Sequence, residues 1–106
     1  MLFRSPPVTT TATGSTNITV NGYRNVMGSV STSGIAATAA HIHQAPAGQT
    51  GPPIVTLERK SDNLWQVPPD TQLTKAQYDA WANGDLYVNV HSPANPAGEI
   101  RAQLKP

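Results

Sequence analysis

The sequence predicts an all-β protein, a β-sandwich or Greek-key barrel with one short helix. The 106 residues suit a single domain over residues 1–106. Ten prolines, eight glycines and only 12% charged residues indicate many turns around a small core. A helix-start signal stands out only near residues 75–83. Short strands at regular spacing with a single crossover helix are typical of sandwiches and barrels.

Composition excludes several function classes. Seven basic and six acidic residues give a net charge of +1, so no nucleic-acid arm or polyanion site is indicated. No apolar run approaches the roughly 18 residues that span a bilayer. The chain has no cysteine, which excludes disulfides, thiolate metal sites and cysteine nucleophiles. Residues 1–5 are too short for a signal peptide, and we interpret them as a truncated first strand or the boundary after a removed leader.

The first half of the chain predicts strands joined by turns. Residues 5–16 are rich in threonine and contain two prolines, which favours an extended, edge-like segment. Asn21-Gly22 predicts a tight two-residue hairpin turn, because both central positions require a positive φ. The return strand is expected at about 23–32. The alanine-rich segment 34–44 could be helical by propensity alone, but turn signals on both sides and the absence of a cap favour a strand.

The second half predicts the one helix. Residues 54–57 are expected to form a strand that continues irregularly to Trp65. Thr74-Lys75-Ala76-Gln77 is a capping-box pattern, so residues 75–83 should be helical and end at Asn83-Gly84. Tyr78 and Trp81, three positions apart, should lie on the buried side of this helix. The core is expected from Ile18, Val20, Ile42, Val88, Val90, Ile100 and Leu104.

The three histidines of the chain fall on compatible strand positions. In a strand, His41 and His43 point to the same face, whereas on a helix they would splay about 200° apart. His91 ends the strand 86–91, whose apolar residues occupy the opposite parity. All three imidazoles are therefore expected on the solvent side of a sheet, where they could bind a metal ion. The simpler alternative is that they are ordinary surface residues.

The hairpin after His91 brings two charged residues into register. A simple register pairs 91 with 99, 89 with 101 and 87 with 103, which places Glu99 and Arg101 on the face of His91. Glu99 could then accept the second imidazole N–H and fix the tautomer of a metal ligand. The alternative is an ion pair with Arg101 on a solvated surface, worth less than about 1 kcal/mol.

Three blocks of sequence resemble the CHRD domain, a module named from the repeats of chordin and widespread in secreted bacterial proteins. The blocks are residues 40–55, 86–92 and 98–104, and the resemblance covers nearly the whole chain. The chain departs from the family pattern at Ala45 and Ala102, where glycine is usual, and at Thr50, where asparagine is usual. The amino-terminal strand looks shortened to residues 2–4.

The resemblance implies a secreted or periplasmic β-sandwich of immunoglobulin-like or superoxide-dismutase-like character. The His-x-His strand with a later histidine also resembles the copper half of copper–zinc superoxide dismutases. The likeness is partial, because this chain has no fourth histidine for an imidazolate bridge and no cysteine for the structural disulfide.

The leading hypothesis is an extracytoplasmic copper-binding domain with His41, His43 and His91 as ligands, and with zinc as the alternative metal. Three ligands leave an open coordination position, which suits storage, delivery, electron transfer or oxidative chemistry. The partner expected under this hypothesis is a second copy of the chain, or a redox or metal-delivery protein. The first alternative is a non-catalytic interaction module with structural histidines. The second is a zinc hydrolase with Glu99 as general base.

Overall fold

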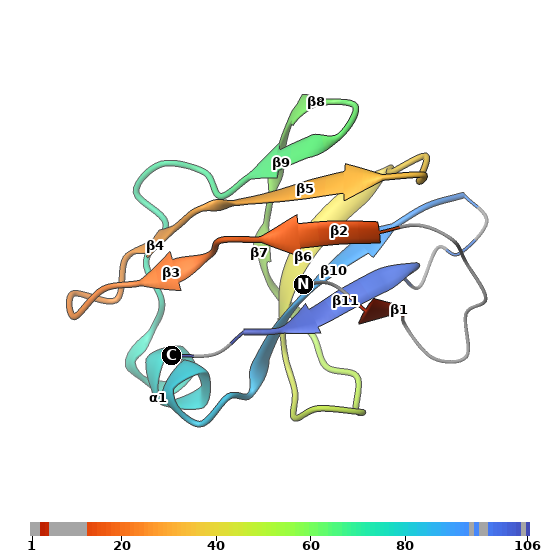
Figure 1. Ribbon diagram of the computed structural model, residues 1–106. Helices are drawn as coiled ribbons and strands as arrows, with labels where there is room; N and C mark the ends of the chain where they lie inside the picture. Colours follow the sequence, from red (N-terminus) through yellow and green to blue (C-terminus); the bar gives the residue numbers. More distant parts are fainter. Residues whose placement is uncertain (1–2, 5–12, 94, 96–97, 105) are drawn as a thin grey trace.

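Two antiparallel sheets face each other across the core of the computed structural model (Figure 1), which describes residues 3–4, 13–93, 95, 98–104 and 106. The larger sheet has the order β1-β11-β10-β6-β7, and the smaller has the order β2-β5-β9-β8. A short ribbon, β3-β4, extends one end. The strands are β1 (Phe3–Arg4), β2 (Thr13–Thr16), β3 (Thr19–Val20), β4 (Val26–Met27), β5 (Ser29–Ser33), β6 (Ala39–Gln44), β7 (Pro53–Thr56), β8 (Glu58–Ser61), β9 (Leu64–Gln66), β10 (Leu86–His91) and β11 (Ile100–Gln103). The all-β sandwich is confirmed, and the described strands do not close into a barrel.

The core forms where the two sheets meet. Alternate residues of β6, β10 and β11 point inward, among them Ile42, Val88 and Ile100, which are almost fully buried. Val30 and Trp65 close the core from the smaller sheet. Five of the seven predicted core residues are buried, whereas Ile18 and Val20 are partly buried and pack against the others.

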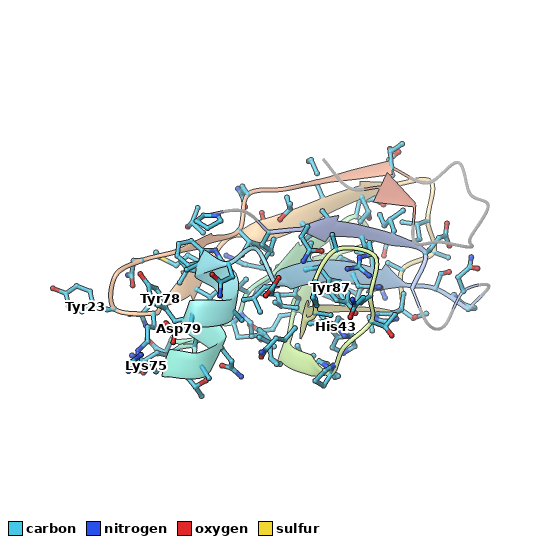
Figure 2. All side chains as sticks on the ribbon, turned by 90° about the horizontal axis from the view of Figure 1, so that it is seen from below. Tyr23, His43, Lys75, Tyr78, Asp79 and Tyr87 are labelled. Atoms are coloured by element: carbon cyan, nitrogen blue, oxygen red, sulfur yellow. The ribbon has the colours of Figure 1, made fainter. Side chains whose placement is uncertain are left out.

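The strand prediction for the alanine-rich segment is confirmed over β6, which pairs with β10 along its whole length. The predicted helix is α1 (Lys75–Ala82), and it connects β9 of one sheet to β10 of the other. Thr74 and Gln77 make both hydrogen bonds of the capping box. Tyr78, labelled on this helix in Figure 2, and Trp81 are partly buried and pack against the core, as predicted.

The tight turn predicted at Asn21-Gly22 is wrong, although a hairpin does form there. β3 and β4 are joined by residues 21–25, and the positive φ of 67° belongs to Arg24. The reason lies in the Asn21 side chain, whose Oδ1 accepts hydrogen bonds from the backbone N–H groups of Tyr23 and Asn25. This side-chain cap stabilises a wider loop than a two-residue turn.

The return strand predicted at 23–32 is interrupted at Gly28, which has a φ of 129°. The backbone of Asn17 and Ile18 approaches Gly28 so closely that a Cβ would collide with it. The chain therefore bends there, and the expected strand becomes β4 and β5.

The remaining segments agree with the predictions in part. β7 is followed not by an irregular continuation but by the β8–β9 hairpin of the smaller sheet, which carries the buried Trp65. β2 lies at the edge of that sheet, as expected, while residues 5–12 of the predicted lead-in lie outside the described residues. The shortened first strand is found at Phe3–Arg4, paired with β11. Among the described residues, no helix is long and apolar enough to cross a membrane.

Candidate metal centre

Adjacent strands of the larger sheet bring the three histidines together. β6 and β10 pair with Tyr87 opposite His43, Asn89 opposite His41 and Ala39 opposite His91. Because these positions alternate along both strands, the three histidines lie on the same face of the sheet. Each imidazole offers one nitrogen atom as a ligand, and these three nitrogen atoms lie within 4.8 Å of one another. The predicted cluster is therefore present, and its members are close enough to hold a metal ion.

His41 and His91 are in direct contact. The Nδ1 atom of His41 lies 3.1 Å from the Nε2 atom of His91, so one ring donates a hydrogen bond to the other. Two nitrogen ligands at about 2.0–2.1 Å from one ion, with an angle of roughly 90–110° between them, would be about 2.8–3.4 Å apart. The two atoms thus already have the separation of ligands that share an ion.

His43 is held by the loop of residues 45–52, which connects β6 to β7. Its Nδ1 atom donates a hydrogen bond of 2.9 Å to the carbonyl oxygen of Gly51. Because a carbonyl can only accept, the proton of the neutral ring lies on Nδ1 and the lone pair on Nε2. This Nε2 atom is buried and has no hydrogen-bond partner within the described part of the chain. A buried acceptor without a partner costs about 1–3 kcal/mol, which a bound metal ion would offset.

The predicted solvent exposure of the histidines is wrong for His43, which is only 9% exposed. The loop of residues 45–52 covers it, and Figure 2 shows His43 and Tyr87 side by side near this loop. The Gly51 N–H also donates to the Tyr87 hydroxyl at 3.2 Å. The loop comes this close because Gly51 has no Cβ, which would collide with the carbonyl of Gln44. His41 and His91 remain half-buried at the rim.

This environment favours neutral imidazoles. Burial lowers the pKa of His41, and the neighbouring charges of His91 and then His43 lower it further. Burial also lowers the pKa of His43, with further lowering from His91 and Arg101, although the hydrogen bond to Gly51 acts in the opposite direction. Since only a deprotonated nitrogen binds a metal, both shifts keep the ligands ready at neutral pH.

The hairpin register predicted between β10 and β11 is confirmed at Tyr87↔Gln103 and Asn89↔Arg101. Ile100, Ala102 and Leu104 point into the core, as expected. Glu99, however, does not lie on a solvated surface, since it is 7% exposed. Its Oε1 accepts a hydrogen bond of 2.6 Å from the Ser92 hydroxyl and a longer one, 3.5 Å, from the Asn95 amide.

Arg101 lies over the ring of Tyr87, with its Cζ atom 3.6 Å from the ring centroid. Its guanidinium donates to the backbone carbonyl of Gln49 at 2.7 Å and to the side-chain oxygen of Gln103 at 3.1 Å. The predicted placement of Arg101 on the histidine face is thus correct, and its contacts connect β11 to the loop of residues 45–52.

Comparison with known proteins identifies the family. The family model described as the CHRD domain matches residues 3–104. The chain belongs to the CHRD domain family. No curated protein and no solved structure gave a significant match. In this CHRD domain, the blocks that carry the resemblance include β6, β10 and β11, the strands that position the histidines and the residues around them.

The structure of this CHRD domain adds residues that the sequence pattern did not single out. Tyr87 stacks on His43, and Asn89 is 5% exposed between His41 and Arg101 in the sheet register. Gly98 packs against Asn89 so closely that a Cβ would collide with its side chain. Strand alternation places Tyr87 and Asn89 on the face of His91, but alternation gives no sign that other segments pack over them.

Proposed function

We propose that this CHRD domain binds one copper ion through His41 Nδ1, His43 Nε2 and His91 Nε2. The observation that carries the proposal is the buried Nε2 atom of His43, which lacks a hydrogen-bond partner among the described residues and belongs to a group of three imidazoles. The contact between His41 and His91 supplies the other two nitrogens at a separation suited to a shared ion. A structural histidine would be expected to satisfy both of its nitrogens when buried.

We favour copper over zinc because of the order of their affinities. Imidazole nitrogen suits both metals, but copper(II) binds more tightly than zinc at a common nitrogen site. Zinc is the alternative metal, and the hydrolytic version of this hypothesis needs Glu99 as a general base. The hydrogen bonds from Ser92 and Asn95 to the buried Glu99 carboxylate favour a positioning role instead. A secreted or periplasmic location accords with the family, which is typical of secreted proteins.

Three protein ligands leave a coordination position open for water, a small ligand or a side chain of a partner. His41 and His91 are only half-buried, so this position would be approached from their side of the cluster. An open position suits copper delivery and oxidative chemistry, in which a partner side chain or a small ligand must reach the ion, while storage and electron transfer do not require it. A second copy of the chain or a metal-delivery protein would be the partner that occupies it.

Glu99 is proposed to orient His91. Since His91 directs Nε2 toward His41, a group that orients the ring would act on Nδ1. The backbone N–H of Glu99 bonds to the carbonyl of Val90 at 2.8 Å, which places Glu99 across the hairpin from the end of β10. A carboxylate that accepts the second N–H of a ligating imidazole fixes its tautomer and raises its basicity.

Metal analysis of the untagged protein tests the proposal. We expect one copper per chain in competition titrations and nitrogen hyperfine structure in the copper(II) EPR spectrum. His43→Ala should abolish tight binding, while Gln66→Ala, at an exposed position of the smaller sheet, should bind like the parent. If the parent and His43→Ala bind copper equally weakly, the histidines are structural and the domain is better regarded as a non-catalytic interaction module.

A further inference from the structure

One side chain from each of three neighbouring strands forms a continuous stack. The imidazole of His43 on β6 lies parallel to the ring of Tyr87 on β10, with centroids 4.9 Å apart and planes 5° apart. Arg101 on β11 lies over Tyr87. Tyr87 is 2% exposed and His43 is also buried, whereas Arg101 is half-buried, so the two rings of the stack are largely removed from water. A cation over an aromatic face is attracted by the electron-rich face of the ring, and the attraction is stronger where water is excluded.

The same three side chains hold the loop of residues 45–52. Arg101 donates to the carbonyl of Gln49, Tyr87 accepts from the N–H of Gly51, and His43 donates to the carbonyl of Gly51. Gly51 therefore has both backbone polar groups satisfied by members of the stack. The loop is thus fixed at two residues by the side chains that it covers.

This arrangement restricts His43 to one orientation and one tautomer. Turning the ring over about the Cβ–Cγ bond would put the Cδ2 carbon in the place of Nδ1, break the bond to Gly51 and leave a covered carbonyl without its donor. Leaving a buried carbonyl without a hydrogen-bond donor destabilises the flipped orientation. The parallel stacking on Tyr87 also opposes any tilt of the ring.

From these contacts we infer that Tyr87 and Arg101 are positioning residues, which hold His43 as the Nδ1–H tautomer with Nε2 presented to the metal before the metal arrives. The metal part of this inference rests on the proposed function. In this scheme His43 is the anchoring ligand of the site. His41 and His91 differ, because they are bonded to each other and one of the two must move its proton to the other ring nitrogen before both can bind.

The experiment compares three variants by two readouts. Nitrogen-15 NMR of the metal-free protein at pH 8 reports the tautomer of His43, and copper competition titration reports affinity. Arg101→Lys keeps the charge but loses the planar stacking and the paired donors. Tyr87→Phe keeps the ring and removes only the hydroxyl that Gly51 bonds. Arg59→Lys is the matched control, because Arg59 makes a comparable contact with Trp65 on the smaller sheet, at 5.9 Å.

We expect the parent and Arg59→Lys to show only the Nδ1–H form of His43. Arg101→Lys should show a mixture of tautomers and copper affinity lowered by about 10-fold or more, within the range found for residues that orient metal ligands. Tyr87→Phe should give a smaller change in the same direction. A pure Nδ1–H form with parental affinity in both Arg101→Lys and Tyr87→Phe would overturn the inference.

The two readouts separate this inference from the proposed function. If the parent binds no copper, the tautomer measurement on the metal-free protein still decides whether the stack orients His43. If copper binds but the tautomer never changes, the metal site stands and the positioning role is rejected. Circular dichroism of each variant shows whether the fold is intact before either measurement is interpreted.

Discussion

The imidazole of His43 lies flat on the phenol ring of Tyr87, its direct partner across β6 and β10. The environment of the His43 ring, of which this contact is a part, affects both its pKa and its tautomer. A surface histidine would titrate near its ordinary pKa and exchange freely between tautomers. The stacked and covered ring of His43 instead has a lowered pKa and a fixed hydrogen bond to Gly51, and both properties suit a metal ligand.

Removal of any one of the three histidines should weaken copper binding strongly. His43→Ala and His91→Ala are each expected to lower copper affinity by orders of magnitude, because two remaining imidazoles cannot complete the site. His41→Ala should do the same. Competition titration with a chelator of known affinity measures the change, and parental affinity in both His41→Ala and His91→Ala would contradict the three-histidine site.

The fold should persist without metal. The three histidines lie on the face of the larger sheet opposite the core, while Ile42, Val88 and Ile100 supply packing on the other side. Metal should therefore stabilise an already folded chain, by about 2.7 kcal/mol at a free-metal concentration of 100 times Kd. Thermal unfolding followed by circular dichroism, with chelator and with added copper, measures this difference. A disordered chain after chelation would show that the metal is required for folding.

Much of the site could be predicted because strand periodicity is a local property. The parity of His41, His43 and His91 follows from alternation along β6 and β10, and the hairpin register follows from the seven residues between His91 and Glu99. The clustering of the imidazoles needed one further condition, that β6 and β10 be neighbours in the sheet. This pairing joins residues about 50 positions apart, and the sequence alone did not contain it.

The errors concern loops and side-chain caps. The burial of His43 and Glu99 depends on segments that fold back over the sheet, and such contacts leave no periodic signal. The loop that covers His43 can form because Gly51 packs closely against the backbone of Gln44. The sequence of this glycine- and proline-rich loop does not show which backbone segment the glycine will contact. Similarly, two hydrogen bonds to the Asn21 side chain stabilise a wider loop where a two-residue turn was predicted.

Acid should weaken both the fold and the metal site. The pKa values of His41 and His43 are lowered on folding, so these groups bind protons more readily in the unfolded chain. Their contribution to stability is complete above the ordinary pKa of about 6.5 and is lost progressively as pH falls through the lowered pKa values. Denaturant unfolding of the metal-free protein between pH 8 and pH 5 should show this decline, and the double variant His41→Ala/His43→Ala should show a smaller one.

The same shifts set the pH range of metal binding. Copper affinity should fall with decreasing pH because protons compete for the imidazole nitrogens. Because the pKa values of His41 and His43 are lowered, the part of this fall that is due to these two ligands should begin below the ordinary pKa of histidine. Titrations at pH 7.5, 6.5 and 5.5 measure the dependence. A decline that is already steep between pH 7.5 and pH 6.5 would contradict the lowered pKa values.

Gly51 should be intolerant of a side chain. A Cβ at this position would meet the backbone of Gln44, so Gly51→Ala must displace the loop that covers His43. We expect a loss of about 1–3 kcal/mol in the free energy of unfolding, the range for an unsatisfied buried hydrogen-bonding group, together with weaker copper binding. Gly22→Ala is the control, since a Cβ there would meet nothing within 4 Å. Equal stability of the two variants in urea would show that the loop adjusts without cost.

The last prediction separates two roles of Glu99. Its carboxylate accepts hydrogen bonds from Ser92 and Asn95, which stabilise the turn, and it is proposed to orient His91 as well. Glu99→Ala should weaken copper binding by about 10- to 100-fold, the range for carboxylates that orient a ligating imidazole, while Glu99→Gln, which can still accept a hydrogen bond, should weaken it less. Ser92→Ala is the control, because it removes the hydroxyl that contacts Glu99 and leaves the carboxylate in place. If Glu99 orients His91, Ser92→Ala and Glu99→Ala should both lower the melting temperature, but only Glu99→Ala should reduce copper affinity strongly. Parental copper affinity in Glu99→Ala would limit this residue to stabilising the turn.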